Sequence, residues 1–177
     1  MTTRPSAVLQ QGIIAGMAGG LAEVAWVAFY AGATGGDPAA LARGVTTAAG
    51  VSALLPASPV ALGITVHMTL AAALGIALSC AWRALREYRP ALRNPFPFAL
   101  AALAAVWAMN FFVVLPIVSP AFIHMVPYAV SLTSKLLFGI ASAAALQWQT
   151  APEIDAGRLA PAPNRIGLGC DQAGREG

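Results

Sequence analysis

The stretch GIIAGMAGGLAEVAWVAFYA, residues 12–31, has a single charged residue and begins with a glycine at every fourth position. In a helix that turns 100° per residue, Gly12, Gly16 and Gly20 lie on one face. Such a small-residue motif lets a neighbouring helix approach closely. Glu23 falls in the same arc, so we expect it to point into a helix–helix seam and not into lipid. The pattern predicts a helix over residues 8–31 that packs through its glycine face.

Three further apolar stretches follow, at residues 59–82, 95–118 and 122–148. Each exceeds the ~20 residues that cross a hydrocarbon core of ~30 Å. None alternates as barrel strands do, so we predict helices. Only 10% of the 177 residues are charged, against about 25% in soluble domains, and the mean hydropathy is +0.71. A soluble enzyme and a disordered chain are excluded; we predict an all-α, integral membrane four-helix bundle over residues 1–148.

The arginines predict the orientation of this bundle. Eight positive residues fall on one side if four helices alternate: Arg4, Arg83, Arg86, Arg89, Arg93, Arg158, Arg165 and Arg175. The other side has only Arg43. By the positive-inside rule, both termini lie in the cytoplasm of a bacterial-type inner membrane. This placement accounts for the basic pI of about 9.3 without a nucleic-acid partner. Arg83, Arg86, Arg89 and Arg93 also suit anionic lipid head groups.

The connecting segments differ in character. Asp37-Pro38 has the form of a helix start, with an acidic N-cap and proline at the first helical position. We expect a short periplasmic interfacial helix over residues 38–49, with Arg43 facing water. The short link 119–121 predicts an antiparallel hairpin of the third and fourth helices. Residues 149–177 contain Gly, Pro, Asp and Arg, which predicts a flexible cytoplasmic tail.

Two charged residues lie well inside a predicted span, Glu23 and Lys135. A charge at the membrane centre costs at least ~2.5–3.5 kcal/mol, so such residues usually have partners and mark candidate sites. A Glu23–Lys135 ion pair is the simplest hypothesis. The pair can specify assembly or take part in function, and the sequence leaves both readings open. The fourth predicted helix also has a polar stripe, and the helical spacing of these residues turns the stripe towards the bundle. The stripe consists of His124, Tyr128, Ser131, Lys135 and Ser142.

Helix two adds His67 and helix three adds Asn110. Estimated depths, at 1.5 Å per residue, bring several polar residues together in the outer half of the bundle. We therefore expect a polar cavity above Lys135, formed by the ligand or proton-relay candidates Glu23, His67, Asn110, His124, Tyr128 and Lys135. A lipid, a quinone or an ion would suit such a cavity. A continuous proton path is not evident, because the inner half of the bundle is mostly Ala and Leu.

Cofactor and enzyme signals are weak. The depths of His67 and His124 differ by roughly 10 Å at 1.5 Å per residue, which argues against bis-histidine haem. The dipeptides His67-Met68 and His124-Met125 suit Cu(I) in ligand type, but helix neighbours point about 100° apart. We expect no cofactor and no metal site. No HExxH, GxSxG or phosphate-binding glycine loop is present, so we expect no catalytic activity.

Size and the absence of motifs favour an accessory or structural subunit of a larger membrane complex. The partners would be the lipid bilayer and other membrane subunits, or further copies of the chain. The alternative is a small proton, ion or solute transporter or channel that acts as a homo-oligomer through Glu23, His67 and Lys135.

Overall fold

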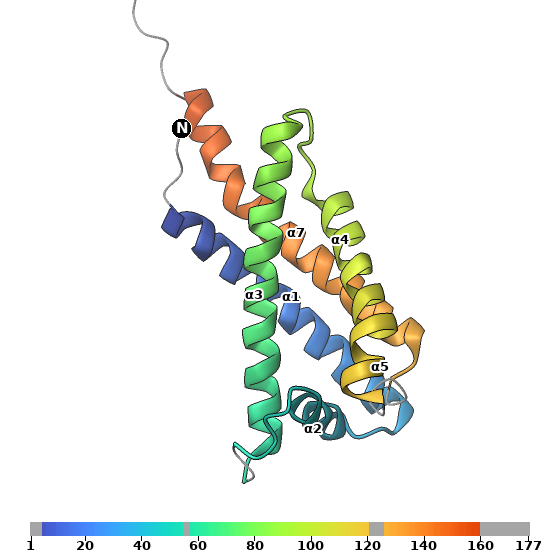
Figure 1. Ribbon diagram of the computed structural model, residues 1–177. Helices are drawn as coiled ribbons and strands as arrows, with labels where there is room; N and C mark the ends of the chain where they lie inside the picture. Colours follow the sequence, from blue (N-terminus) through green and yellow to red (C-terminus); the bar gives the residue numbers. More distant parts are fainter. Residues whose placement is uncertain (1–4, 55–56, 121–125, 160–177) are drawn as a thin grey trace, which may run out of the picture.

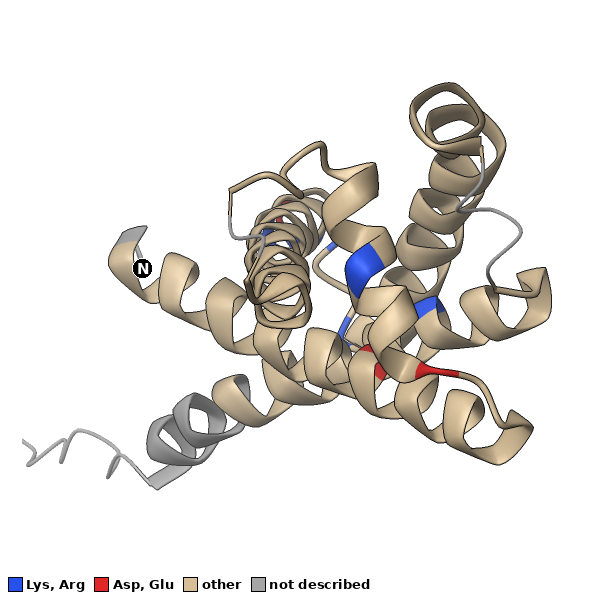
Figure 2. Ribbon diagram, turned by 90° about the horizontal axis from the view of Figure 1, so that it is seen from below, with Lys and Arg blue, Asp and Glu red and all other residues tan. Residues whose placement is uncertain are grey.

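The computed structural model describes residues 5–54, 57–120 and 126–159, and most of these residues are helical, with no strand among them. Four helices are long and apolar enough to cross a membrane, as predicted from the sequence. They are α1 (Pro5–Thr34), α3 (Pro59–Tyr88), the continuous run of α4 (Pro95–Met109), η1 (Asn110–Val114) and α5 (Leu115–Val118), and α7 (Tyr128–Leu159). Few charges interrupt these helices (Figure 2).

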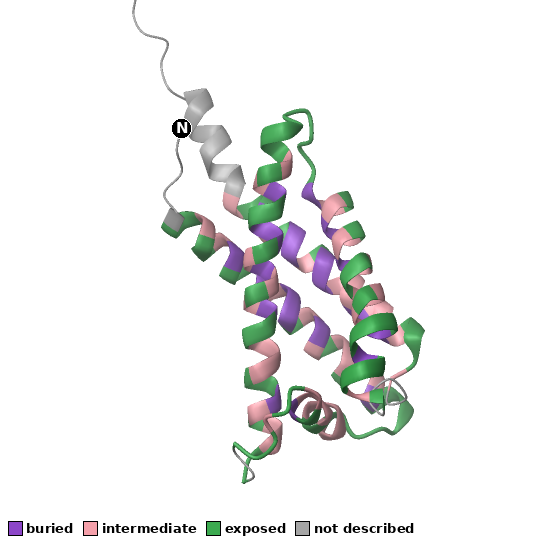
Figure 3. Ribbon diagram, in the orientation of Figure 1, coloured by how far each residue is buried: buried purple, intermediate pink, exposed green. Residues whose placement is uncertain are grey.

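The helices pack in the spatial order α3, α1, α7, α4 (Figure 1). The inner pair, α1 and α7, is more buried: 33% and 44% of their most apolar stretches are buried, against 17% for α3 and 22% for the α4–α5 run. Buried positions accordingly follow the crossings of the helices (Figure 3). Phe138 of α7, fully buried, is part of a core cluster with Leu78 of α3 and Leu103 of α4. The outer helices α3 and α4 contact each other only sparsely.

The glycine face of α1 lies against α3. A Cβ at Gly12 would approach the backbone of Ile76, and one at Gly16 would overlap the carbonyl oxygen of Ala71. On α3, Gly75 is equally tight against Gly16. At Gly20 the nearest atom is the Ala71 Cβ, 2.7 Å from the position of an added Cβ. The two backbones therefore cross at a distance that side chains would not allow.

The predicted interfacial helix is α2 (Pro38–Ala48), which packs on α3 (Figure 1). Asp37 is its N-cap, and one carboxylate oxygen accepts a hydrogen bond of 2.8 Å from the Ala39 N–H. The other oxygen pairs with exposed Arg43 at 2.6 Å. The hydrogen bond from Arg43, and then that from the Ala39 backbone, lower the pKa of Asp37 below its usual value. Capping by Asp37 and exposure of Arg43 agree with the sequence.

The run of α4, η1 and α5 covers the predicted residues 95–118 but contains a π-turn that was not predicted. Leu115 N–H donates to the carbonyl of Asn110, five residues back, which widens the helix at η1. Pro116 accounts for this turn. Proline has no N–H and its ring clashes with the carbonyl four residues earlier, and a wider turn moves that carbonyl away.

The predicted fourth helix, 122–148, is wrong at both ends. Val126 and Pro127 are not helical, and α7 begins at Tyr128. Proline disfavours helical backbone in the residue before it, so the chain starts the helix after Pro127. At its other end α7 passes Trp148 and runs to Leu159, into the segment predicted as a tail. Residues 160–177 of that tail lie outside the described residues, as do residues 121–125 of the predicted hairpin.

We expect Gly16→Ala to lower the stability of the folded chain by about 1–3 kcal/mol, the usual cost of overpacking. The added methyl group would meet the Ala71 carbonyl and the Ala72 backbone. Thermal unfolding of the detergent-solubilised protein measures the effect. Gly32→Ala is the matched control in the same helix, because a Cβ there meets nothing within 4 Å. Equal melting temperatures for the two variants would contradict the close crossing.

Candidate functional site

Three polar side chains of the spans lie around one carboxylate, that of Glu23 on α1. The residue is only 3% exposed. Lys135 of α7 places its Nζ 2.6 Å from Oε1 and 2.9 Å from Oε2 of Glu23. Ser134 Oγ donates a further hydrogen bond of 3.1 Å to Oε1. The ion pair predicted between Glu23 and Lys135 is therefore present. Oε2 accepts a hydrogen bond from Lys135, and Oε1 accepts one from Ser134.

His67 of α3 completes this cluster without a hydrogen bond. Its Nε2 lies 3.8 Å from Glu23 Oε2, beyond hydrogen-bond distance. This nitrogen is buried and has no partner among the described residues. The distance is short enough for attraction between Glu23 and a protonated imidazole. Glu23, Ser134, Lys135 and His67 are called the carboxylate cluster below.

The outer edge of the carboxylate cluster is partly exposed. The side chain of Lys135 is 21% exposed and that of His67 is 23% exposed, whereas that of Glu23 is 4% exposed. Lys135 Nζ also lies 5.8 Å from the centroid of the Phe138 ring, within the range of a cation–π contact. The buried charge of Glu23 is thus compensated inside the protein, while parts of the Lys135 and His67 side chains reach the surface of the bundle.

Further hydrogen bonds continue along the seam between α1 and α7. Trp26 Nε1 donates to the Val130 carbonyl at 3.1 Å, and Ser142 Oγ donates to the Ala15 carbonyl at 2.9 Å. Ser142 is fully buried. These bonds keep the same antiparallel register as the pair of Glu23 with Ser134. Of the polar stripe predicted on this helix, Ser131, Lys135 and Ser142 therefore face the bundle, whereas Tyr128 is half exposed.

The structure does not bring every predicted site residue to the carboxylate cluster. Tyr128 stacks instead among Trp107, Phe111 and Phe112, with ring centroids 5.8 to 6.3 Å from its own. The Trp107 indole donates to Ser131 Oγ at 3.0 Å. Asn110 starts the π-turn, and its side chain makes no hydrogen bond to a described residue. Among the described residues, no hydrogen bond or ion pair joins Tyr128 or Asn110 to Glu23, so their predicted convergence with Glu23 stays a prediction.

His124 lies outside the described residues, so its place in the predicted cavity is not addressed. Ser134 belongs to the cluster and was not among the predicted site residues. The sequence did contain a signal for Ser134, because it directly precedes Lys135. It also lies four residues from both Val130 and Phe138, on a helix face that packs on α1. Within the described ranges, no three His, Cys, Asp or Glu side chains lie together as a metal site would require.

Arg83, Arg86, Arg89 and Arg93 lie at the opposite end of the bundle from α2. Arg83 and Arg86 of α3, with Arg93 before α4, line one pocket that the starts of α1 and α4 and the second half of α7 complete. Arg89, at the end of α3, is exposed and does not line it. No protein-family model, curated protein or solved structure matches the chain.

We expect Glu23→Gln and Lys135→Met each to destabilise the fold by about 3 kcal/mol, because either leaves a charge or a polar group unpaired inside the seam. The double variant should lose clearly less than the two single losses together. Thermal or denaturant unfolding in detergent measures this cycle. Arg43→Met, at the exposed pair with Asp37, is the control and should have little effect. Additive losses would show that Glu23 and Lys135 do not depend on each other.

Proposed function

We propose that the chain is a small accessory subunit of a larger membrane complex, with α3 and the α4–α5 run receiving helices of other subunits. The carrying observation is the exposed edge of the carboxylate cluster. About a fifth of the Lys135 and His67 side chains is uncovered. Side chains that carry such groups inside a membrane usually face other helices or water, because exposing the polar group to hydrocarbon is costly. A neighbouring subunit would cover them.

The packing order supports the same proposal. The inner helices α1 and α7 hold each other through a buried ion pair and hydrogen bonds, whereas α3 and α4 each pack mainly on one inner helix. Large apolar side chains remain exposed on the outer helices, among them Leu70, Phe112 and Ile117. Two tightly packed inner helices and two outer helices with exposed apolar side chains suit a subunit that binds its neighbours through α3 and the α4–α5 run.

Transport as a homo-oligomer is the second candidate, and His67 favours it. Its buried, unpartnered Nε2 lies 3.8 Å from a carboxylate. Histidine beside a carboxylate is a combination that occurs in the relays of pumps and transporters. Against it, the Glu23 carboxylate already accepts hydrogen bonds from Lys135 and Ser134, so its partners lie within the chain itself.

We expect a mild-detergent pull-down of the tagged chain from its native membranes to recover larger membrane subunits in fixed stoichiometry, read by mass spectrometry. Leu70→Trp should lower this recovery at least about fivefold, because overpacking at a contact costs about 1–3 kcal/mol. Leu21→Trp is the matched control: Leu21 and Leu70 are both 60% exposed, but Leu21 lies on α1.

Recovery of the chain alone, as a monomer or as a homo-oligomer, would overturn the subunit proposal. Loss of pH-dependent flux in an intact Glu23→Gln homo-oligomer would then establish the transport alternative.

We also propose an inner-membrane location with both termini in the cytoplasm, based on the arginine distribution. A reporter active only in the periplasm should be silent when fused after Gly177 and active when inserted after Gly50, in the segment between α2 and α3. Activity after Gly177 would contradict this orientation.

A further inference from the structure

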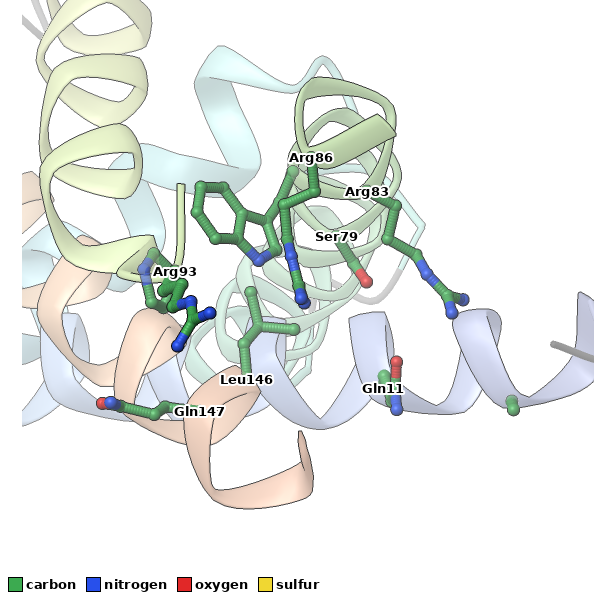
Figure 4. Close-up of a pocket in the computed structure, with 10 residues that line it drawn as sticks. Gln11, Ser79, Arg83, Arg86, Arg93, Leu146 and Gln147 are labelled. Carbon is green, nitrogen blue, oxygen red and sulfur yellow. The ribbon is translucent and has the colours of Figure 1, made fainter. Parts of the chain in front are cut away.

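The start of α1, the end of α3, the start of α4 and the second half of α7 enclose a basic pocket of about 120 Å³. Its basic residues are Arg83, Arg86 and Arg93. The other lining residues are Ala7, Gln11, Ser79, Trp82, Pro95, Leu146 and Gln147. None of these described lining residues is acidic. Figure 4 shows the Arg86 and Arg93 side chains extending towards the space around Leu146.

If these arginines served only to orient the chain in the membrane, they would not need to line the same cavity. The positive-inside rule needs arginines on one side of the membrane, but it does not need them to share a cavity. Arg89 satisfies the rule while lying outside the pocket. Arg86 and Arg93 come from opposite sides of the α3–α4 link, and Arg83 lies one turn before Arg86. Like charges held close together repel, and a bound anion would offset that repulsion.

The walls of the pocket combine polar and apolar groups. Trp82, 6% exposed, and Leu146, also 6% exposed, form apolar parts of the lining. Gln11 and Gln147 add side-chain amides, which donate hydrogen bonds. Guanidinium groups bind phosphate oxygens in bidentate geometry, and basic pockets between membrane helices bind anionic head groups. An indole beside them fits the membrane–water boundary, where tryptophan is enriched.

We propose that this pocket binds a phosphate group, and that its source is the head group of an anionic phospholipid. Its volume corresponds to about four liquid water molecules at ~30 Å³ each. A head-group phosphate fits this space, and the acyl chains remain in the bilayer beside the helices. Arg86, Arg93 and Gln147 are exposed, so the pocket is accessible from the membrane surface.

The test uses the full chain in detergent micelles titrated with phosphatidylglycerol or phosphatidylcholine, with bound lipid counted by native mass spectrometry. We expect phosphatidylglycerol to be retained and phosphatidylcholine to be lost. Arg86→Gln and Arg93→Gln should each weaken phosphatidylglycerol binding about fivefold. Arg89→Gln, which removes an equal charge outside the pocket, should leave it unchanged.

Three results would overturn the proposal. Equal retention of the two lipids would remove the charge selectivity, and this comparison needs no variant to fold. Equal weakening by Arg89→Gln would point to diffuse attraction in place of a pocket. Displacement of the lipid by inorganic phosphate at equal concentration would make the site one for soluble anions.

Discussion

The carboxylate of Glu23 is the constraint on which the packing of this chain depends. An ionised group inside an apolar seam needs partners within hydrogen-bond distance, and Lys135 and Ser134 of α7 provide them. That requirement allows one antiparallel register of α1 and α7, and the bonds of Trp26 and Ser142 agree with it. A shift by one residue would turn Lys135 away by about 100° and leave both charges unpaired.

The α1 helix packs against two neighbouring helices at once. Gly16 has no side chain, so α3 approaches the α1 backbone there, while Gly19 leaves room for the Phe138 ring of α7. Glu23 lies one turn beyond Gly19 and faces both neighbours, which brings His67 of α3 near a carboxylate already held by Lys135. The small residues determine how close the helices come, and the ion pair determines their register.

Much of this arrangement was predictable from the sequence because strong, local signals carried it. Apolar length predicted four spans, the Asp37-Pro38 pair predicted α2, and the periodicity of Glu23 and Lys135 predicted a pair. The position of Tyr128 was not predictable by the same means. It depends on the start of α7 after Pro127 and on the π-turn before Pro116, which rotate side chains away from ideal helical positions. Depth estimates at 1.5 Å per residue ignore both effects.

The basic pocket and the carboxylate cluster lie at different levels of the same framework, and both depend on α1. Gln11 lies three turns before Glu23 on α1 and contributes to the pocket, and its carbonyl accepts a hydrogen bond of 3.5 Å from Gln149 of α7. The register imposed at Glu23 therefore extends to the end of the helices where the arginines meet. Sequence alone showed the arginines as charges on one side of a membrane. Their convergence on one cavity required the crossing of α1 and α3, which brings the end of α3 over the start of α1.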